Sequence, residues 1–111
     1  MARGDGRPRA PAPMTRVLRV EPEAEAELEE AIDWYESRRR GLGLEFARVV
    51  RAGFAALERT PDLGPEVWGR VRQVVLRRFP YSLYYVLEPE LISILAVFHA
   101  RRNPRDWQRR G

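Results

Sequence analysis

Residues 79–99, FPYSLYYVLEPELISILAVFH, decide the fold of this chain. A tight connection at Glu88-Pro89-Glu90 separates two runs rich in aromatic, leucine and β-branched side chains, Tyr81–Glu88 and Leu91–His99. Such runs joined by so short a turn predict two neighbouring antiparallel strands. The second run is apolar at both odd and even positions, so we expect that strand to be covered on both of its faces.

The chain before these two strands predicts a helical hairpin flanked by two further strands. We expect strands at Thr15–Val20 and at Arg70–Phe79, although the second alternates poorly and carries arginine on both faces. Apolar side chains at helical spacing predict helices from Pro22 to about Arg39 and from about Gly43 to Arg59, joined by a glycine turn. The order βααβββ predicts an α+β fold: a helical hairpin packed on one face of a small, mostly antiparallel sheet.

Composition excludes several classes of function. The 111 residues include no cysteine and a single histidine, His99. The sequence therefore predicts no disulfide scaffold, no cysteine nucleophile and no zinc site, and a chain of this length leaves little room for a cofactor domain. No apolar run reaches the roughly 20 residues that a membrane span needs, and the N-terminus lacks the apolar stretch of a secretory signal. We expect a cytoplasmic protein without metal or cofactor.

The termini differ in composition from the rest of the chain. Residues 1–13, MARGDGRPRAPAP, are rich in proline, glycine and arginine and show no apolar period. They predict a disordered basic tail or a start assigned too early, with a basic arm for nucleic acid as the alternative. A regular pattern begins at Met14, so we expect one domain over residues 14–107 and a basic C-terminal end over residues 108–111.

Charge is segregated along the sequence. The formal net charge is +4, all 20 basic residues are arginine, and residues 21–36 hold eight acidic residues and no basic one. The acidic run is predicted to form the solvated face of the first helix, with Trp34 and Tyr35 packing in the core or in the hairpin. Two helices cover only one face of the sheet, so a partner, the folded-back tail or a second copy is expected to cover the other.

Three segments carry a resemblance to a known family. Phe79–Val86 (FPYSLYYV), Ile92–Val97 (ISILAV) and His99–Trp107 (HARRNPRDW) together resemble the RelE/ParE superfamily of toxins from type II toxin–antitoxin systems. The Trp34-Tyr35 pair and the Gly41-Leu42-Gly43 turn fit as well. The resemblance spans roughly residues 14–107 and is stronger to the ParE-like branch than to the ribonuclease branch.

The resemblance implies both fold and function. It implies the βααβββ fold and a toxin that a small cognate antitoxin neutralises by wrapping around it in a hetero-oligomer. It also implies a role in plasmid stabilization and growth inhibition through DNA gyrase, without catalysis. The alternatives are a ribosome-dependent mRNA endoribonuclease of the RelE type and a non-toxic relative that only binds its partner.

Three positions depart from what the ribonuclease branch implies. Ser82 and Ala100 stand where arginines would be expected, and the late aromatic residue is Trp107, which cannot exchange a proton. Cleavage of RNA without a metal needs a base, an acid and cations around the phosphate. These departures favour a protein that is not an enzyme. If it does catalyse RNA cleavage, the candidate residues are His99, Tyr81, Tyr85, Arg101 and Arg102.

Arginines and aromatic residues near the C-terminus are predicted to contact the target or the antitoxin. The basic tail contains Arg101, Arg102, Arg105, Arg109 and Arg110 around Trp107, and Arg70, Arg72, Arg77 and Arg78 extend the charge along the preceding strand, with Tyr85 and His99 beside them. Such a set could also hold nucleic acid by phosphate contacts and stacking, or form a solvated tail. A lone histidine at a strand end, such as His99, more often makes a structural hydrogen bond than acts as a base.

Overall fold

The computed structural model describes residues 16–111. The expected N-terminal tail over residues 1–13 and the start of the first strand at Thr15 lie outside these residues. Eight elements follow one another along the chain: β1 (Val17–Val20), α1 (Pro22–Arg38), α2 (Leu42–Arg59), β2 (Glu66–Trp68), β3 (Val71–Val75), β4 (Tyr81–Glu88), β5 (Leu91–His99) and α3 (Arg105–Gln108).

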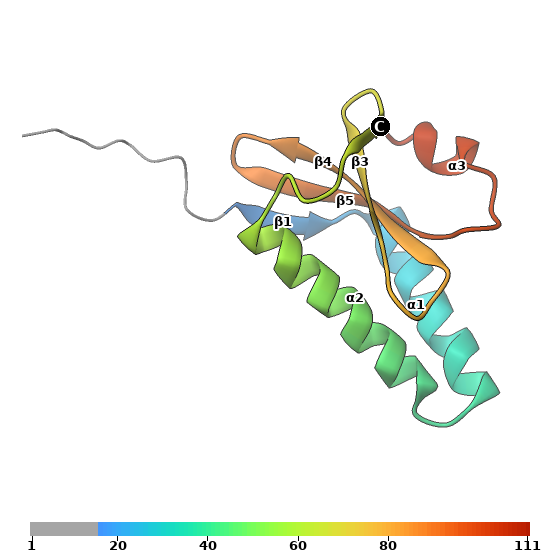
Figure 1. The fold of residues 1–111 in the computed structure, drawn as a ribbon. Coiled ribbons are helices and arrows are strands. Elements are labelled where there is room, and N and C mark those ends of the chain that lie inside the picture. The colour runs from blue at the N-terminus through green and yellow to red at the C-terminus, as the bar shows by residue number, and fades with distance from the viewer. Residues whose placement is uncertain (1–15) are drawn as a thin grey trace, which may run out of the picture.

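The strands form one sheet in the order β1-β5-β4-β3-β2, with the helical hairpin on one of its faces (Figure 1). β1 runs parallel to β5, and the other neighbours are antiparallel. In the β4–β5 pair Leu83 lies opposite Val97, and the register shifts between Tyr84 and Tyr85. The predicted α+β class, the helical hairpin and the mostly antiparallel sheet are confirmed.

Two predictions about the strands are wrong. The strand expected at Arg70–Phe79 ends at Val75, because the Leu76 N–H donates to the Tyr81 carbonyl at 2.9 Å and closes the chain into a turn. Arg78 in this turn takes a positive φ of 73°, which no strand residue adopts. The short edge strand β2 was missed, since all three of its residues are exposed and show no alternation.

The turn between the helices depends on a carboxylate and two glycines. Gly41 has a φ of 88°, and its N–H donates to Glu36 Oε2 at 2.9 Å. The Gly43 N–H donates to the other carboxylate oxygen at 3.0 Å, so Glu36 caps the N-terminus of α2, where the helix dipole favours a negative charge. A Cβ on Gly43 would lie 2.6 Å from the Ile32 carbonyl, so only glycine permits this close approach of the helices.

The main core lies between the helices and the sheet. Its large side chains with no exposed surface come from α2, β4 and β5: Phe46, Val50, Leu57, Leu83, Tyr85, Ile92 and Ile94. Tyr35 of α1 adds edge-to-face contacts, with its ring 4.9 Å from that of Phe79. Removing this apolar area from water is the main stabilising contribution to the fold.

The C-terminal segment covers the opposite face of the sheet. Trp107 of α3 is only 4% exposed and stacks on Tyr84 of β4, with ring centroids 4.0 Å apart and planes 14° from parallel. Phe98 and Leu95 are buried in the same cluster. The sequence left a partner, the folded-back tail or a second copy as possible covers for this face, and in the structure the tail covers it. Both faces of β5 are covered, as predicted. Among residues 16–111, no helix combines the length and the apolar character needed to cross a membrane.

Candidate functional site

A cleft opens between α1 and the ends of β4 and β5. Its volume is about 350 Å³. One wall is α1 and the other is the sheet edge, and the lining residues are Glu27, Glu30, Ala31, Trp34, Tyr81, Val97, His99 and Arg102. Three of the five catalytic candidates from the sequence, Tyr81, His99 and Arg102, therefore meet in one place.

Local structure explains this meeting. The lining residues of α1 are spaced three or four apart, so they lie along one face of the helix. Tyr81 and His99 are directly opposite each other in the β4–β5 pair, and both point to the side of the sheet that carries the helices. Their rings lie 5.1 Å apart in an edge-to-face arrangement. The cleft is thus framed by a helix face and one cross-strand pair.

His99 makes a local structural hydrogen bond. Its Nδ1 accepts the Arg101 backbone N–H at 3.0 Å. Since Nδ1 is the acceptor, the neutral imidazole carries its proton on Nε2. A general base would need an unprotonated nitrogen facing the substrate, so this tautomer does not serve that role.

Tyr81 is held in its neutral form. Burial raises the pKa of its phenol above the usual value, and the negative charge of Glu30 and Glu27 acts in the same direction. Tyr81 therefore stays protonated at neutral pH and offers a hydroxyl group rather than a phenolate. As a proton donor it could act as an acid rather than as a base.

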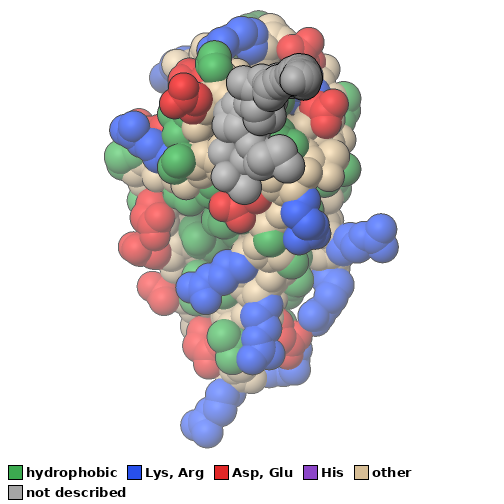
Figure 2. Space-filling model, turned by 90° about the vertical axis from the view of Figure 1, so that its left-hand side faces the viewer, with side chains coloured by type: hydrophobic (Ala, Val, Ile, Leu, Met, Phe, Trp, Pro, Cys, Tyr) green, Lys and Arg blue, Asp and Glu red, His purple; other side chains and the backbone are tan. Residues whose placement is uncertain are grey.

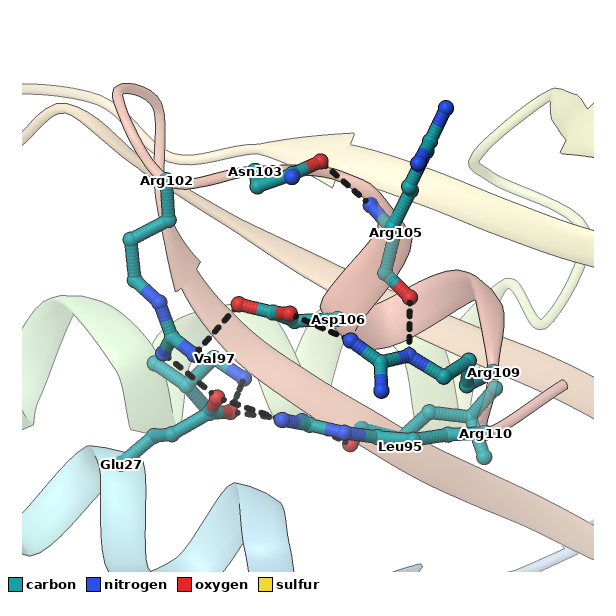
Figure 3. A network of polar contacts seen from close by, with 9 residues as sticks. All are labelled: Glu27, Leu95, Val97, Arg102, Asn103, Arg105, Asp106, Arg109 and Arg110. Carbon is teal, nitrogen blue, oxygen red and sulfur yellow. Dashed lines mark hydrogen bonds and ion pairs between the residues drawn. The ribbon is translucent and has the colours of Figure 1, made fainter.

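Glu27 is the centre of an ion-pair network that joins α1 to the C-terminal segment (Figure 3). Its carboxylate accepts from Arg102 Nη1 at 2.8 Å, from Arg110 Nη2 at 3.0 Å and from the Val97 backbone N–H at 3.1 Å. The Glu27 side chain is only 10% exposed. The prediction that the whole acidic run is a solvated face is wrong at this position, because Glu27 belongs to the face of α1 that packs on the sheet.

The charge of Arg102 is used inside the protein. Its guanidinium donates to Glu27 and to Asp106, the latter at 3.3 Å, and lies 4.3 Å from the centre of the Phe98 ring. Arg109 pairs with the other oxygen of Asp106 at 3.0 Å. A cation that already faces two carboxylates is a poor ligand for phosphate, so Arg102 does not provide the free positive charge that RNA cleavage needs.

Tyr85 and Arg72 lie away from the cleft and hold a loop. Tyr85 is fully buried, its hydroxyl group donates to the Pro61 carbonyl at 2.9 Å, and it accepts the Gly64 N–H at 2.9 Å. Arg72 donates to the Gly64 carbonyl at 2.7 Å. Burial raises the pKa of Tyr85 as well. The structure thus gives Tyr85, a candidate for both catalysis and binding, an anchoring role beneath residues 61–64.

The other basic candidates are distributed over several surfaces. Arg70 lies 3.9 Å from Glu88 at an exposed position. Arg78 donates to Glu45 at 2.7 Å, and this hydrogen bond, assisted by the charge of Arg78, lowers the pKa of Glu45. Arg77, Arg101 and Arg105 are exposed and form no ion pair with another described residue, whereas Trp107 is buried. The candidate set is therefore not one site.

A polar group that the sequence did not single out lies under the C-terminal tail. Gln73 donates from Nε2 to both Ser82 Oγ at 3.0 Å and the Tyr84 hydroxyl at 2.9 Å. Burial raises the pKa of Tyr84, and Trp107 covers its ring. The three polar side chains are neutral and satisfy one another, so this group stabilises the sheet rather than offering reactive atoms. Alternation along β3 and β4 could have placed them on one face.

Surface charge is as unevenly distributed in space as in the sequence. On the face shown in Figure 2, arginine side chains gather over the lower part, and acidic side chains are most numerous along the left edge. Within residues 16–111, no group of three histidine, cysteine or acidic side chains is arranged to hold a metal ion.

Comparisons with known proteins agree with this geometry. The family model described as the ParE toxin of the type II toxin–antitoxin system parDE matches residues 18–104. A solved chain from the chromosomal ParDE TA system of P. aeruginosa is similar to this chain, with a TM-score of 0.71 at 21% sequence identity. The match covers 79% of this chain and 99% of that one, and at this identity it shows a shared fold. None of the curated protein sequences matches significantly.

Proposed function

The chain belongs to the ParE toxin family of type II toxin–antitoxin systems, and from this premise we propose that it inhibits growth by binding DNA gyrase, without catalysis, until a cognate antitoxin neutralises it. The resemblance to the ParE-like branch read from the C-terminal sequence is confirmed. The observation that supports a binding mechanism most directly is the state of the cleft, where two of the three candidate catalytic groups, His99 and Arg102, are already engaged within the protein.

The ribonuclease alternative needs groups that the cleft does not supply. Its histidine accepts a backbone hydrogen bond through Nδ1, its arginine faces Glu27 and Asp106, and its tyrosine has a raised pKa. A phosphodiester entering the cleft would meet the carboxylate of Glu30, which forms no ion pair with a described residue, and be repelled by it. These contacts favour a toxin that acts by occupying its target.

The exposed apolar surface supports a wrapping antitoxin. A groove of about 310 Å³ lies between α2 and β3, and its walls are Val49, Ala52, Gly53, Val74, Val75, Leu76 and Arg77. Val75 is 69% exposed there. We infer that an antitoxin segment with apolar side chains on one face and acidic ones beside them covers this groove, because the apolar walls lie next to Arg77.

Pulse labelling after induction of the chain without antitoxin tests the target. Incorporation of thymidine and of leucine is followed over the first minutes, and purified protein is added to a gyrase supercoiling assay. We expect thymidine incorporation to fall first and supercoiling to be inhibited. An early fall of leucine incorporation would favour the ribonuclease, and no effect from soluble protein would favour a non-toxic relative.

Two variants separate binding from catalysis in the same assay. Tyr81→Phe keeps the aromatic ring but removes the hydroxyl group that Tyr81 presents to the cleft. A toxin that acts by binding does not need this group as an acid, so the variant should still inhibit growth. Arg101→Ala combined with Arg105→Ala removes two exposed charges that form no ion pair with a described residue, and should weaken inhibition if the basic tail contacts the target. Full inhibition by this double variant would remove the tail from the contact surface.

A further inference from the structure

The cleft beside α1 has the charge and the aromatic walls of a site for a cation. Its two carboxylates differ in their surroundings. Glu27 is nearly buried and neutralised by Arg102 and Arg110. Glu30 is exposed at the cleft and forms no ion pair with another residue of the described chain. Arg102 is engaged by both Glu27 and Asp106, so the charge in the cleft lining that has no ion-pair partner among the described residues is the negative charge of Glu30.

The negative potential reaches across to the sheet wall. Glu30 of α1 and Tyr81 of β4 line the same cleft from opposite walls; burial and the charge of Glu30 raise the pKa of the Tyr81 phenol, and the charge of Arg102 opposes them. Any ligand that lies between α1 and β4 would therefore be within reach of Glu30. Coulomb attraction in so partly enclosed a space favours a positive group and disfavours a phosphate.

Aromatic rings complete the walls. Trp34 is 51% exposed, and Tyr81 and His99 form the opposite side. A guanidinium or ammonium group over an aromatic ring is attracted by the ring's electrons, most strongly by those of tryptophan. The chain itself demonstrates this for Trp34, because the Arg38 guanidinium lies 4.5 Å from the centre of its ring.

We propose that this cleft binds a basic side chain, preferably arginine, of a partner protein, held between the Trp34 and Tyr81 rings and paired with Glu30. The proposal rests on the proposed function only in assuming that the chain acts through protein partners. Arginine suits the site better than lysine because its planar guanidinium stacks on aromatic rings and pairs with a carboxylate through two hydrogen bonds.

Titration of the full chain with small probes tests this directly. N-acetyl-arginine amide, N-acetyl-norleucine amide and inorganic phosphate are each added while the three tryptophan indole signals are followed by NMR. We expect saturable shifts at Trp34 with the arginine probe at millimolar concentration, and none at Trp68 or Trp107. Norleucine and phosphate should leave the Trp34 signal in place. Equal shifts with norleucine, or saturation by phosphate, would overturn the proposal.

Two substitutions at exposed positions of α1 identify the charge that matters. Glu30→Gln should weaken the binding of N-acetyl-arginine amide about fivefold, which is the effect of losing one partly exposed ionic contact. Glu29→Gln removes the neighbouring exposed charge and should leave binding unchanged. Equal binding to the wild type and Glu30→Gln would refute the pairing. Because the probes act on the isolated chain, this result is independent of whether the chain inhibits gyrase.

Discussion

Glu27→Gln tests whether the C-terminal segment is held by a buried carboxylate. The substitution keeps one oxygen for the Val97 N–H but removes the charge that Arg102 and Arg110 share. Breaking a buried ion pair costs about 3 to 5 kcal/mol, and an exposed pair contributes below about 1 kcal/mol. The Glu27 and Arg110 side chains are 10% and 18% exposed, whereas Arg102 is 42% exposed, so most of the loss comes from Arg110. We expect a decrease of about 2 to 3 kcal/mol in the free energy of unfolding.

Thermal and urea unfolding, followed by circular dichroism, measure this change. For a domain of this length the expected loss lowers Tm by about 10 °C. Glu29→Gln is the matched control, since it removes an exposed charge from the same helix and should shift the free energy by less than about 0.5 kcal/mol. If Glu27→Gln behaved like this control, the network would contribute no stability and the argument from burial would fail.

Three further predictions concern the rest of the fold. Trp107→Ala removes the ring that stacks on Tyr84 and should lower the free energy of unfolding by about 3 kcal/mol, measured by urea unfolding. Proteolysis of the tail should also become faster. An unchanged urea midpoint would mean that the tail does not stabilise the sheet. Gly64→Ala should destabilise by about 1 to 3 kcal/mol, because its Cβ would lie 2.8 Å from the Gln73 carbonyl carbon; equal unfolding curves would contradict this. Folding raises the pKa of all four tyrosines above the ordinary value of 10.0. Their contribution to the free energy of unfolding is therefore fully present below pH 10. It decreases as the pH rises from 10 towards the folded-state pKa values, because the phenols of the unfolded chain lose their protons first. Absorbance at alkaline pH checks this, and titration of the folded phenols at the ordinary value would contradict it.

The elements with strong periodicity could be predicted, and the irregular ones could not. Tyr81–Glu88 and Leu91–His99 are the strands that the sequence predicts, with unchanged bounds, because apolar side chains on both faces leave little choice of structure. Glu66–Trp68 became a strand only through pairing with β3, since its side chains are exposed and bury nothing. The turn after Val75 is closed by a hydrogen bond between Leu76 and Tyr81 and needs a positive φ at Arg78, which the identity of an arginine does not predict.

The candidate site was predicted in part. The sequence named Tyr81 and His99 as separate candidates, and the structure places them opposite each other because a tight turn joins their strands. It gave no sign that Arg102 pairs with Glu27, which lies 75 residues away. A signal for Glu27 was nevertheless present: it follows Ala24 by three residues and precedes Ala31 by four, and both alanines are buried. An acid within an apolar helical stripe indicates a buried partner.

The network around Glu27 changes what the positive charge of the tail means for function. Five arginines follow His99, but Arg102, Arg109 and Arg110 pair with Glu27 or Asp106. These ion pairs hold the tail against the sheet, so only Arg101 and Arg105 remain to pair with an acidic partner. Counting basic residues therefore overstates the surface available for contact, and a partner that approaches the α1 side of the tail meets carboxylates. Opposite charges on neighbouring surfaces favour one orientation of a partner over others, which suits a toxin that must be recognised by both an antitoxin and a target.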